Sequence, residues 1–178
     1  MLTVAPPDAA ESRCNATFEA LMWSMARPGD VRELPEAGLS AIVEALIDRE
    51  CVAYADSPAL NRQLGEAGAR LGRTDEADHL FLDRLDGASD ALATIRCGSA
   101  LYPDDGATLV AQVAHGTGQR LRLTGPGIDG ARDMMLALPA AFWALRQELC
   151  TYPEGFDLLL VDGRSVVGIP RSTRIEVL

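Results

Sequence analysis

The chain has 178 residues, of which 48% are hydrophobic, and a formal net charge of −10. This hydrophobic content excludes a disordered chain, and the acidic excess excludes nucleic acid as a bulk electrostatic partner. No apolar run reaches the roughly 18 residues that a membrane helix needs, and residues 1–11 lack the features of a signal peptide. We therefore expect a single cytoplasmic domain over residues 1–178, without a membrane partner.

The first half of the chain alternates helices with short strands. Asp8 and Glu11 form a capping-box pattern before a helix that stops at Arg27-Pro28-Gly29. Ser57-Pro58 places a cap and a first-turn proline before another helix, which Gly72 can end. The apolar stripe of the first helix is Cys14, Phe18, Leu21, Met22 and Met25, and the following elements are a strand at 31–34, a helix at 39–49, a strand at 52–55, a helix at 58–71, a strand at 79–82 and a helix at 89–96.

The second half is richer in strands. We expect residues 108–113 and 120–124 to form a hairpin through residues 115–118, and residues 134–149 to be helical, with an interruption or a new start at Pro139. Asp162-Gly163 is a strong turn signal between strands at 157–161 and 166–169. This order of elements predicts an α/β fold with a mixed sheet flanked by helices.

Several kinds of catalytic site are excluded by the residue types present. All 16 basic residues are arginines, so the chain has no lysine for a Schiff base or a P-loop. The four cysteines lie far apart, there are two histidines, and no nucleophile elbow occurs. We therefore expect no catalytic residue and no metal site in this chain.

The segment Arg122-Leu123-Thr124-Gly125-Pro126-Gly127 is a candidate ligand-binding turn. A strand runs into this turn before a stretch that we expect to be helical. Its glycines let the backbone approach a ligand, and its N–H groups can hold an anion. The alternative is a tight turn that needs glycine for a positive φ. The candidates here are Arg122, Thr124, Gly125 and Gly127.

The second candidate segment, Arg171-Ser172-Thr173-Arg174, lies near the C-terminus. Arginine forks match the oxygens of phosphate or phosphonate, and the two hydroxyls can add hydrogen bonds. Salt bridging or a subunit contact is the alternative. Arg27 is a further candidate, with a plain surface position as its alternative, because a helix stop explains Pro28 and Gly29.

Three blocks of the sequence together resemble the PhnH family, the H subunits of bacterial carbon–phosphorus lyase. The N-terminal block runs from Phe18 through Arg27-Pro28-Gly29, and the central one from Gly106 to Ile128. The last runs from Gly155 to Val177, with Ser172 where the family usually has threonine. Their shared order and spacing cover most of the chain except residues 50–102.

The resemblance implies a fold similar to the core of pyridoxal-phosphate (PLP)-dependent transferases, without the cofactor. It also implies a homodimer that joins the G, I and J subunits. That assembly attaches an alkylphosphonate to the ribose carbon of a nucleoside triphosphate, giving a ribose 1-alkylphosphonate 5-triphosphate, before the carbon–phosphorus bond is broken.

Three functional hypotheses follow. In the first, the chain is a non-catalytic or co-catalytic subunit that binds partner subunits, with a phosphorylated small molecule as an optional ligand. In the second, it is a stand-alone nucleotide or phosphonate transferase in which Arg122, Thr124, Arg171 and Arg174 form an anion pocket. In the third, it is a scaffold without any ligand.

Overall fold

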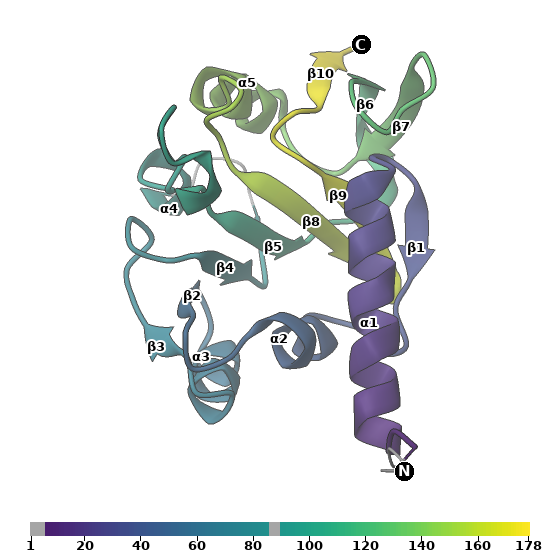
Figure 1. Ribbon diagram of the computed structural model, residues 1–178. Coiled ribbons are helices and arrows are strands. Elements are labelled where there is room, and N and C mark those ends of the chain that lie inside the picture. The colour runs from purple at the N-terminus through teal and green to yellow at the C-terminus, as the bar shows by residue number, and fades with distance from the viewer. Residues whose placement is uncertain (1–5, 86–89) are drawn as a thin grey trace.

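A mixed seven-stranded sheet runs through the centre of the protein, whose computed structural model describes residues 6–85 and 90–178 (Figure 1). The strands, in spatial order, are β1 (Val31–Glu33), β9 (Ser165–Ile169), β8 (Asp157–Asp162), β5 (Thr108–Gln112), β4 (His79–Leu82), β2 (Val52–Ala55) and β3 (Arg70–Leu71). Strands β3, β2, β4, β5 and β8 are parallel, whereas β9 is antiparallel to β8 and β1 to β9. The predicted mixed α/β sheet is confirmed.

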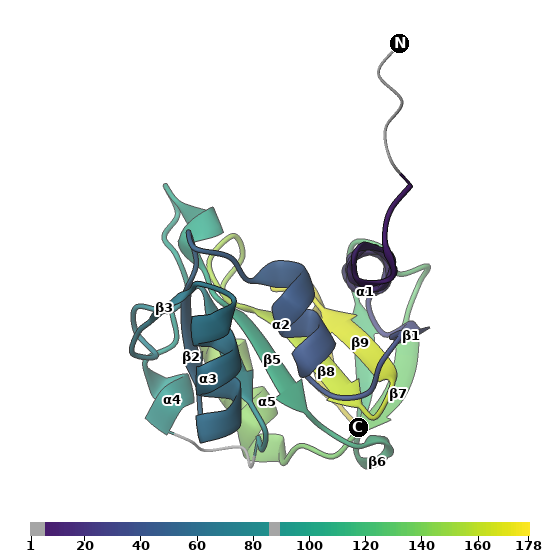
Figure 2. The same ribbon diagram turned by 90° about the horizontal axis from the view of Figure 1, so that it is seen from below.

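Different elements pack on the two faces of the central sheet (Figures 1 and 2). One face carries the helices α1 (Ala9–Ala26), α2 (Ser40–Leu46) and α3 (Pro58–Glu66). The other carries α4 (Asp90–Ala93), α5 (Ala140–Leu149) and a second, antiparallel sheet of β10 (Arg174–Val177), β6 (His115–Thr124) and β7 (Arg132–Leu136). A single 3-10 turn, η1 (Pro103–Asp105), precedes β5. The second sheet was not predicted.

Each face of the central sheet has its own hydrophobic core, because side chains of a strand alternate between faces. In β8, Leu158 and Leu160 pack toward α5 and the second sheet, and Leu159 and Val161 pack toward α1 and α2. The parallel strands therefore have nearly continuous apolar sequences, as expected for strands buried on both sides. No described helix is both long and apolar enough to cross a membrane.

Local sequence signals predicted several boundaries correctly. The Asp8 carboxylate accepts the Glu11 N–H at 2.8 Å and the Asp8 N–H donates to Glu11 Oε2 at 2.9 Å, which is a capping box. The hydroxyl of Ser57 accepts from the backbone of Leu60 at the start of α3. A tight turn with Gly163 at φ +59° joins β8 to β9. These signals act over a few residues, so they need no knowledge of the fold.

The predicted hairpin of residues 108–124 is wrong. Strand β5 lies between β4 and β8, so both of its edges are already paired. Residues 115–118 belong to β6, which pairs with β7 and β10 in the other sheet. The turn at Gly125–Gly127 accordingly leads from β6 into β7, and not into a helix.

Four further expectations need correction. Residues 134–136 belong to β7, so the helical pattern begins only after Pro139. Helix α3 ends at Glu66, and Leu71 lies in β3 beside β2. In α1 the buried side chains are Thr17, Leu21 and Ser24, while Phe18 and Met22 of the predicted stripe are about half exposed. The predicted helix at 89–96 is observed over Asp90–Ala93, and its first residue, Ser89, lies outside the described residues.

Candidate functional site

A cleft with a volume of about 830 Å³ lies between α5 and β10. Residues of the loop from β9 to β10 and of the β6–β7 turn also line it. The elements that line it, α5 and β10, lie near the top of the view in Figure 1, and Arg171 in the lining contacts Asp157 at the start of β8 and Gly106 just before β5. Its lining residues are Thr124, Gly125, Pro126, Trp143, Arg146, Gln147, Cys150, Tyr152, Arg171, Ser172, Thr173, Arg174 and Ile175.

Arg146 is a buried cation in the wall of this cleft. Its side chain comes from the last turn of α5, and the residue is 4% exposed. Nη1 donates to Thr173 O at 3.3 Å and Nη2 donates to Pro170 O at 2.8 Å, so the guanidinium holds the β9–β10 loop against α5. Among the described residues, no carboxylate lies within salt-bridge distance of it. Burial consequently lowers the pKa of Arg146, although Cys150 and Asp157 act in the opposite direction.

Three buried polar atoms of the cleft residues have no hydrogen-bond partner in the described part of the chain. They are Nε of Arg146, Nε1 of Trp143 and Oγ1 of Thr173, and the last two residues are each 3% exposed. Leaving such a group without a partner usually costs about 1–3 kcal/mol. The Trp143 ring packs edge-on against Phe142, with centroids 4.8 Å apart, which holds the indole in place.

Arg171 also lines the cleft, but groups of its own chain engage its guanidinium. Nη2 lies 2.6 Å from Asp157 Oδ2 and 3.2 Å from Gly106 O, and Nη1 donates to Pro103 O. The hydrogen bond with Asp157 raises the pKa of Arg171. This residue joins the C-terminal loop to the starts of β5 and β8, which is the salt-bridging role considered as its alternative.

The two predicted segments meet at Gly125. Its φ of +135° is one that side-chain-bearing residues rarely adopt, and a β-carbon there would lie 3.0 Å from Ser172 O. Glycine thus lets the β6–β7 turn approach the β9–β10 loop closely, so Thr124 and Gly125 share the cleft with residues 171–174. Arg174 is exposed on β10 and forms no salt bridge with any described residue.

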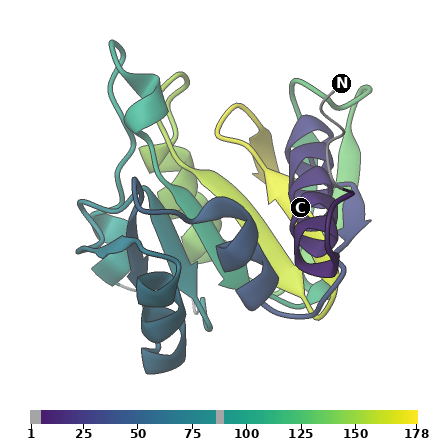
Figure 3. The ribbon, with the colours of Figure 1, turned by 60° about the horizontal axis from the view of Figure 1, so that its bottom comes forward.

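Three predicted residues lie outside the cleft. Arg122 is on β6 and pairs with Asp133 of β7, with Nε 2.9 Å from Oδ1, and this hydrogen bond raises the pKa of Arg122. Gly127, at φ +80°, sits against the carbonyl of Ala26 at the end of α1. Arg27 lies over the Trp23 ring at 5.4 Å from its centroid. In Figure 3, α1 (purple) and β7 (green) lie at the same edge of the central sheet, although they cover opposite faces of it.

Sequence reasoning missed the contribution of α5. The buried positions of this helix are Phe142, Trp143 and Arg146. The available signal was an arginine one turn after Phe142 and Trp143, that is, a charge within the apolar face of an otherwise core-facing helix. Such a position requires either a partner or a function.

The two histidines lie away from this cleft. Burial lowers the pKa of His79 on β4 and of His115 on β6, so both favour the neutral form. His115 lies 3.2 Å from Leu160 O through its Nε2. Within residues 6–85 and 90–178, no three histidine, cysteine or acidic side chains gather as a metal site would require.

Comparison with known proteins identifies relatives along the whole chain. Residues 8–176 match the family PhnH, described as the bacterial phosphonate metabolism protein. A Stutzerimonas stutzeri protein named as a C–P lyase subunit, HtxG, is 32% identical over 188 aligned residues, covering 99% of this chain and 95% of that protein. The alpha-D-ribose 1-methylphosphonate 5-triphosphate synthase subunit PhnH of Rhizobium meliloti (strain 1021) is 31% identical, with 90% of this chain and 89% of the relative covered. The chain therefore belongs to the PhnH family of bacterial phosphonate metabolism proteins.

Proposed function

We propose that this chain is a subunit of a carbon–phosphorus lyase core complex. In that complex it contributes to forming a ribose 1-alkylphosphonate 5-triphosphate from a nucleoside triphosphate and an alkylphosphonate. The observation that carries the proposal is the match over residues 8–176, together with relatives whose names place them in such an enzyme. Its place of action is the cytoplasm, where nucleoside triphosphates are available.

The chemistry of the described residues supports a subunit that does not act alone. The cleft contains arginines, hydroxyls and an indole, but no histidine and no carboxylate among its lining residues. The lining therefore offers no histidine or carboxylate as a general base where a phosphonate would bind, and besides its arginines its ionisable side chains are the Cys150 thiol and the Tyr152 phenol. The chain has no lysine, so it cannot form an internal aldimine with PLP.

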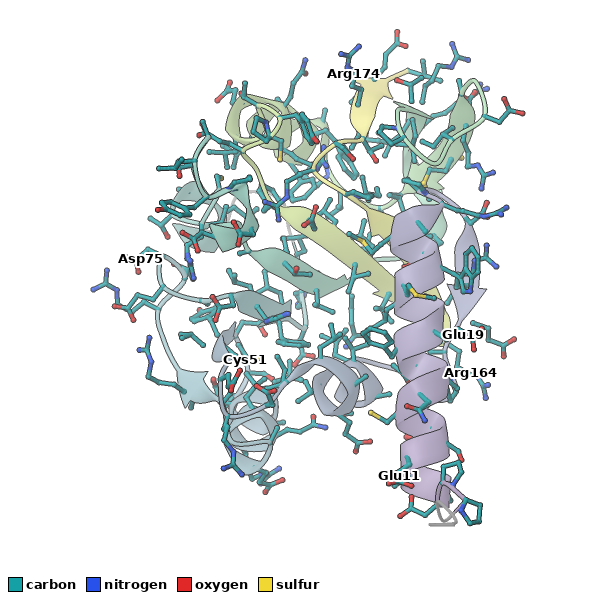
Figure 4. All side chains as sticks on the ribbon, viewed as in Figure 1. Glu11, Glu19, Cys51, Asp75, Arg164 and Arg174 are labelled. Carbon is teal, nitrogen blue, oxygen red and sulfur yellow. The ribbon has the colours of Figure 1, made fainter. Side chains whose placement is uncertain are left out.

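The outer surface of α1 supports a role in assembly. Phe18 and Met22, one turn apart on the helix, are 52% and 48% exposed, and we call these two residues the α1 apolar surface. In Figure 4 the helix stands at the edge of the molecule. Neighbouring exposed apolar side chains of this size are typical of protein–protein contacts. We assign this surface to homodimer formation or to contact with the G, I and J subunits.

The resemblance to PLP-dependent transferases is part of the same proposal. It is supported by the mixed seven-stranded sheet with helices on both faces. In our proposal the fold is similar to such a transferase core and serves an assembly instead of a cofactor. A systematic superposition on transferase cores, in which the strand order failed to correspond, would reject this similarity.

Co-expression tests the subunit proposal. The tagged chain, produced together with the G, I and J subunits, should yield one co-purifying particle in size-exclusion chromatography. It should also restore growth on methylphosphonate as sole phosphorus source to a strain that lacks its own H subunit. Separation of this chain from all three partners, without restored growth, would reject the proposal.

The volume of the cleft and its arginines favour one alternative, a stand-alone transferase. Purified chain incubated with ATP and methylphosphonate, followed by phosphorus NMR, separates the two. The subunit proposal expects no new phosphonate ester without the partners. Turnover by the isolated chain at a useful rate would favour the transferase.

A further inference from the structure

Three buried polar atoms without a described partner belong to residues that line the cleft, and they share one chemical character. The Arg146 Nε and Trp143 Nε1 groups can only donate hydrogen bonds, and the Thr173 hydroxyl can donate one. All three residues line the same cleft and are at most 4% exposed. A ligand that satisfies them must supply acceptors, which excludes an ammonium group or a metal cation.

The cleft lining is positively charged, whereas the protein as a whole is negatively charged. The chain carries a net charge of −10, yet the cleft lining holds three arginines and no aspartate or glutamate. Asp157 neutralises Arg171, which leaves Arg146 in the wall and Arg174 on β10 without a salt bridge among the described residues. An anion bound here would relieve the desolvation of Arg146, because a buried cation is costly without a counter-charge.

We propose that the cleft between α5 and β10 binds the tetrahedral oxyanion of a phosphonate or phosphate group, with Trp143, Arg146 and Thr173 as its hydrogen-bond donors. Arg174 adds positive charge at the β10 side of the cleft. The volume of about 830 Å³ lies within the roughly 300–1,000 Å³ of small-molecule sites, so it holds an organic group as well as the oxyanion. The oxyanion therefore belongs either to an alkylphosphonate or to a nucleotide.

Binding to the isolated chain is the direct test. Inorganic phosphate, methylphosphonate and ATP are titrated separately by isothermal calorimetry at low ionic strength. We expect saturable binding of at least one probe, and the tightest probe identifies the source of the oxyanion. The choice of methylphosphonate and ATP rests on the proposed function, whereas the donor geometry does not.

Two threonines allow a matched pair of variants. Thr173 is buried with an unpartnered hydroxyl, whereas buried Thr17 in α1 donates to Arg13 O at 2.9 Å. Thr173→Val should keep the melting temperature and weaken binding by about tenfold, because one hydrogen bond to a charged group is lost. Thr17→Val should lower the melting temperature and leave binding unchanged.

A second pair of variants tests the role of positive charge in binding, and one further variant tests the role of the indole N–H. Arg174→Gln should weaken binding several-fold, while Arg164→Gln, which removes the same charge far from the cleft, should not (Figure 4). Trp143→Phe keeps an aromatic ring but loses Nε1, and we expect weaker binding with the secondary structure unchanged. Circular dichroism checks the fold of each variant.

Equal affinity in Thr173→Val and wild type would overturn the proposal, as would the absence of binding by all three probes at millimolar concentration. A large drop in melting temperature for Thr173→Val would overturn it too, since the hydroxyl would then have a structural partner. These outcomes are separate from those of the subunit proposal, because co-purification requires no ligand. A chain that binds the oxyanion but fails to join G, I and J would reject the subunit proposal alone.

Discussion

Arg146 and Arg171 show how differently one residue type can be held within a single cleft. Arg171 is paired with Asp157 at 2.6 Å and also contacts backbone carbonyls before β5. Arg146 has two carbonyl acceptors and no described carboxylate partner. The sequence indicated only Arg171 of the two as a candidate for anion binding, because it belongs to the segment Arg171-Ser172-Thr173-Arg174. The buried charge without a counter-ion became visible only with the tertiary contacts.

Gly106 should be intolerant of even the smallest side chain. A β-carbon there would collide with the Arg171 guanidinium and with Gly155 O. Gly106→Ala should therefore lower the free energy of unfolding by about 3 kcal/mol, because the Arg171–Asp157 pair would have to move. Gly65→Ala in α3 is the control: its β-carbon meets nothing within 4 Å, so we expect equal or greater stability. Urea titrations of both variants measure the difference.

The stability of the protein should fall as the pH is lowered below neutrality. Burial lowers the pKa of His79 and His115 in the folded protein, so the unfolded chain takes up protons more readily than the folded one below about 6.5. The stabilisation that the two neutral histidines give to the folded protein is fully present above about pH 6.5. It is lost as the pH falls below this value toward the pKa of the histidines in the folded protein. His79→Gln should make the dependence of unfolding free energy on pH shallower between pH 7 and 5. An unchanged slope in this variant would contradict the assignment.

At the scale of elements, helix α1 departs most from its amphipathic pattern. Its buried face is narrow and partly polar, with Thr17, Leu21 and Ser24, and a β-carbon on Gly168 of β9 would press on the backbone of Ser24. Small residues on both sides let the helix lie close to β9. The larger apolar side chains of the α1 apolar surface are consequently left facing outward.

Polar substitutions in the α1 apolar surface should prevent assembly without reducing the stability of the folded chain. In Phe18→Ser/Met22→Ser, we expect a nearly unchanged melting temperature, because both side chains are about half exposed. Self-association or capture of the G, I and J subunits should be lost, as sedimentation velocity and co-purification would measure. Leu101→Ser, at a residue 77% exposed elsewhere on the protein, should alter neither. If the double variant kept both interactions, α1 would not be the contact.

At the scale of the whole molecule, the cleft depends on how the second sheet packs on the first. β10 pairs with residues 121–124 of β6, and its Ile175 packs against the same core as α5. The cleft thus lies between α5 and the second sheet, and its two walls come from segments far apart in the sequence. Its residues have no fixed relation to one another unless both sheets are in place.

Removal of β10 tests this dependence. A chain ending at Thr173 loses the strand pairs Arg174–Thr124 to Val177–Leu121, which leaves one edge of β6 open. We expect a melting temperature lower by several degrees and loss of oxyanion binding, with helical circular dichroism retained. A truncated chain that still bound methylphosphonate or ATP as tightly as the full chain would show that β10 does not form the site.

Short-range features were determined by the sequence itself. The capping box of Asp8 and Glu11, the Ser57 cap and the Gly163 turn each involve residues a few positions apart, so their energetics are local. The absence of lysine and the three blocks of family motif are likewise properties of the letters. They were sufficient for a mixed α/β fold and for the PhnH family.

The tertiary structure alone decided which strands pair and which side chains meet. Strands adjacent in the chain, β5 and β6, were separated because β4 and β8 occupy both edges of β5. Arg146 lines the cleft because α5 packs beside β10. Arg122 lies outside the cleft and pairs with Asp133 on the neighbouring strand. Strand choice and burial depend on free energies summed over distant residues, which no local pattern contains.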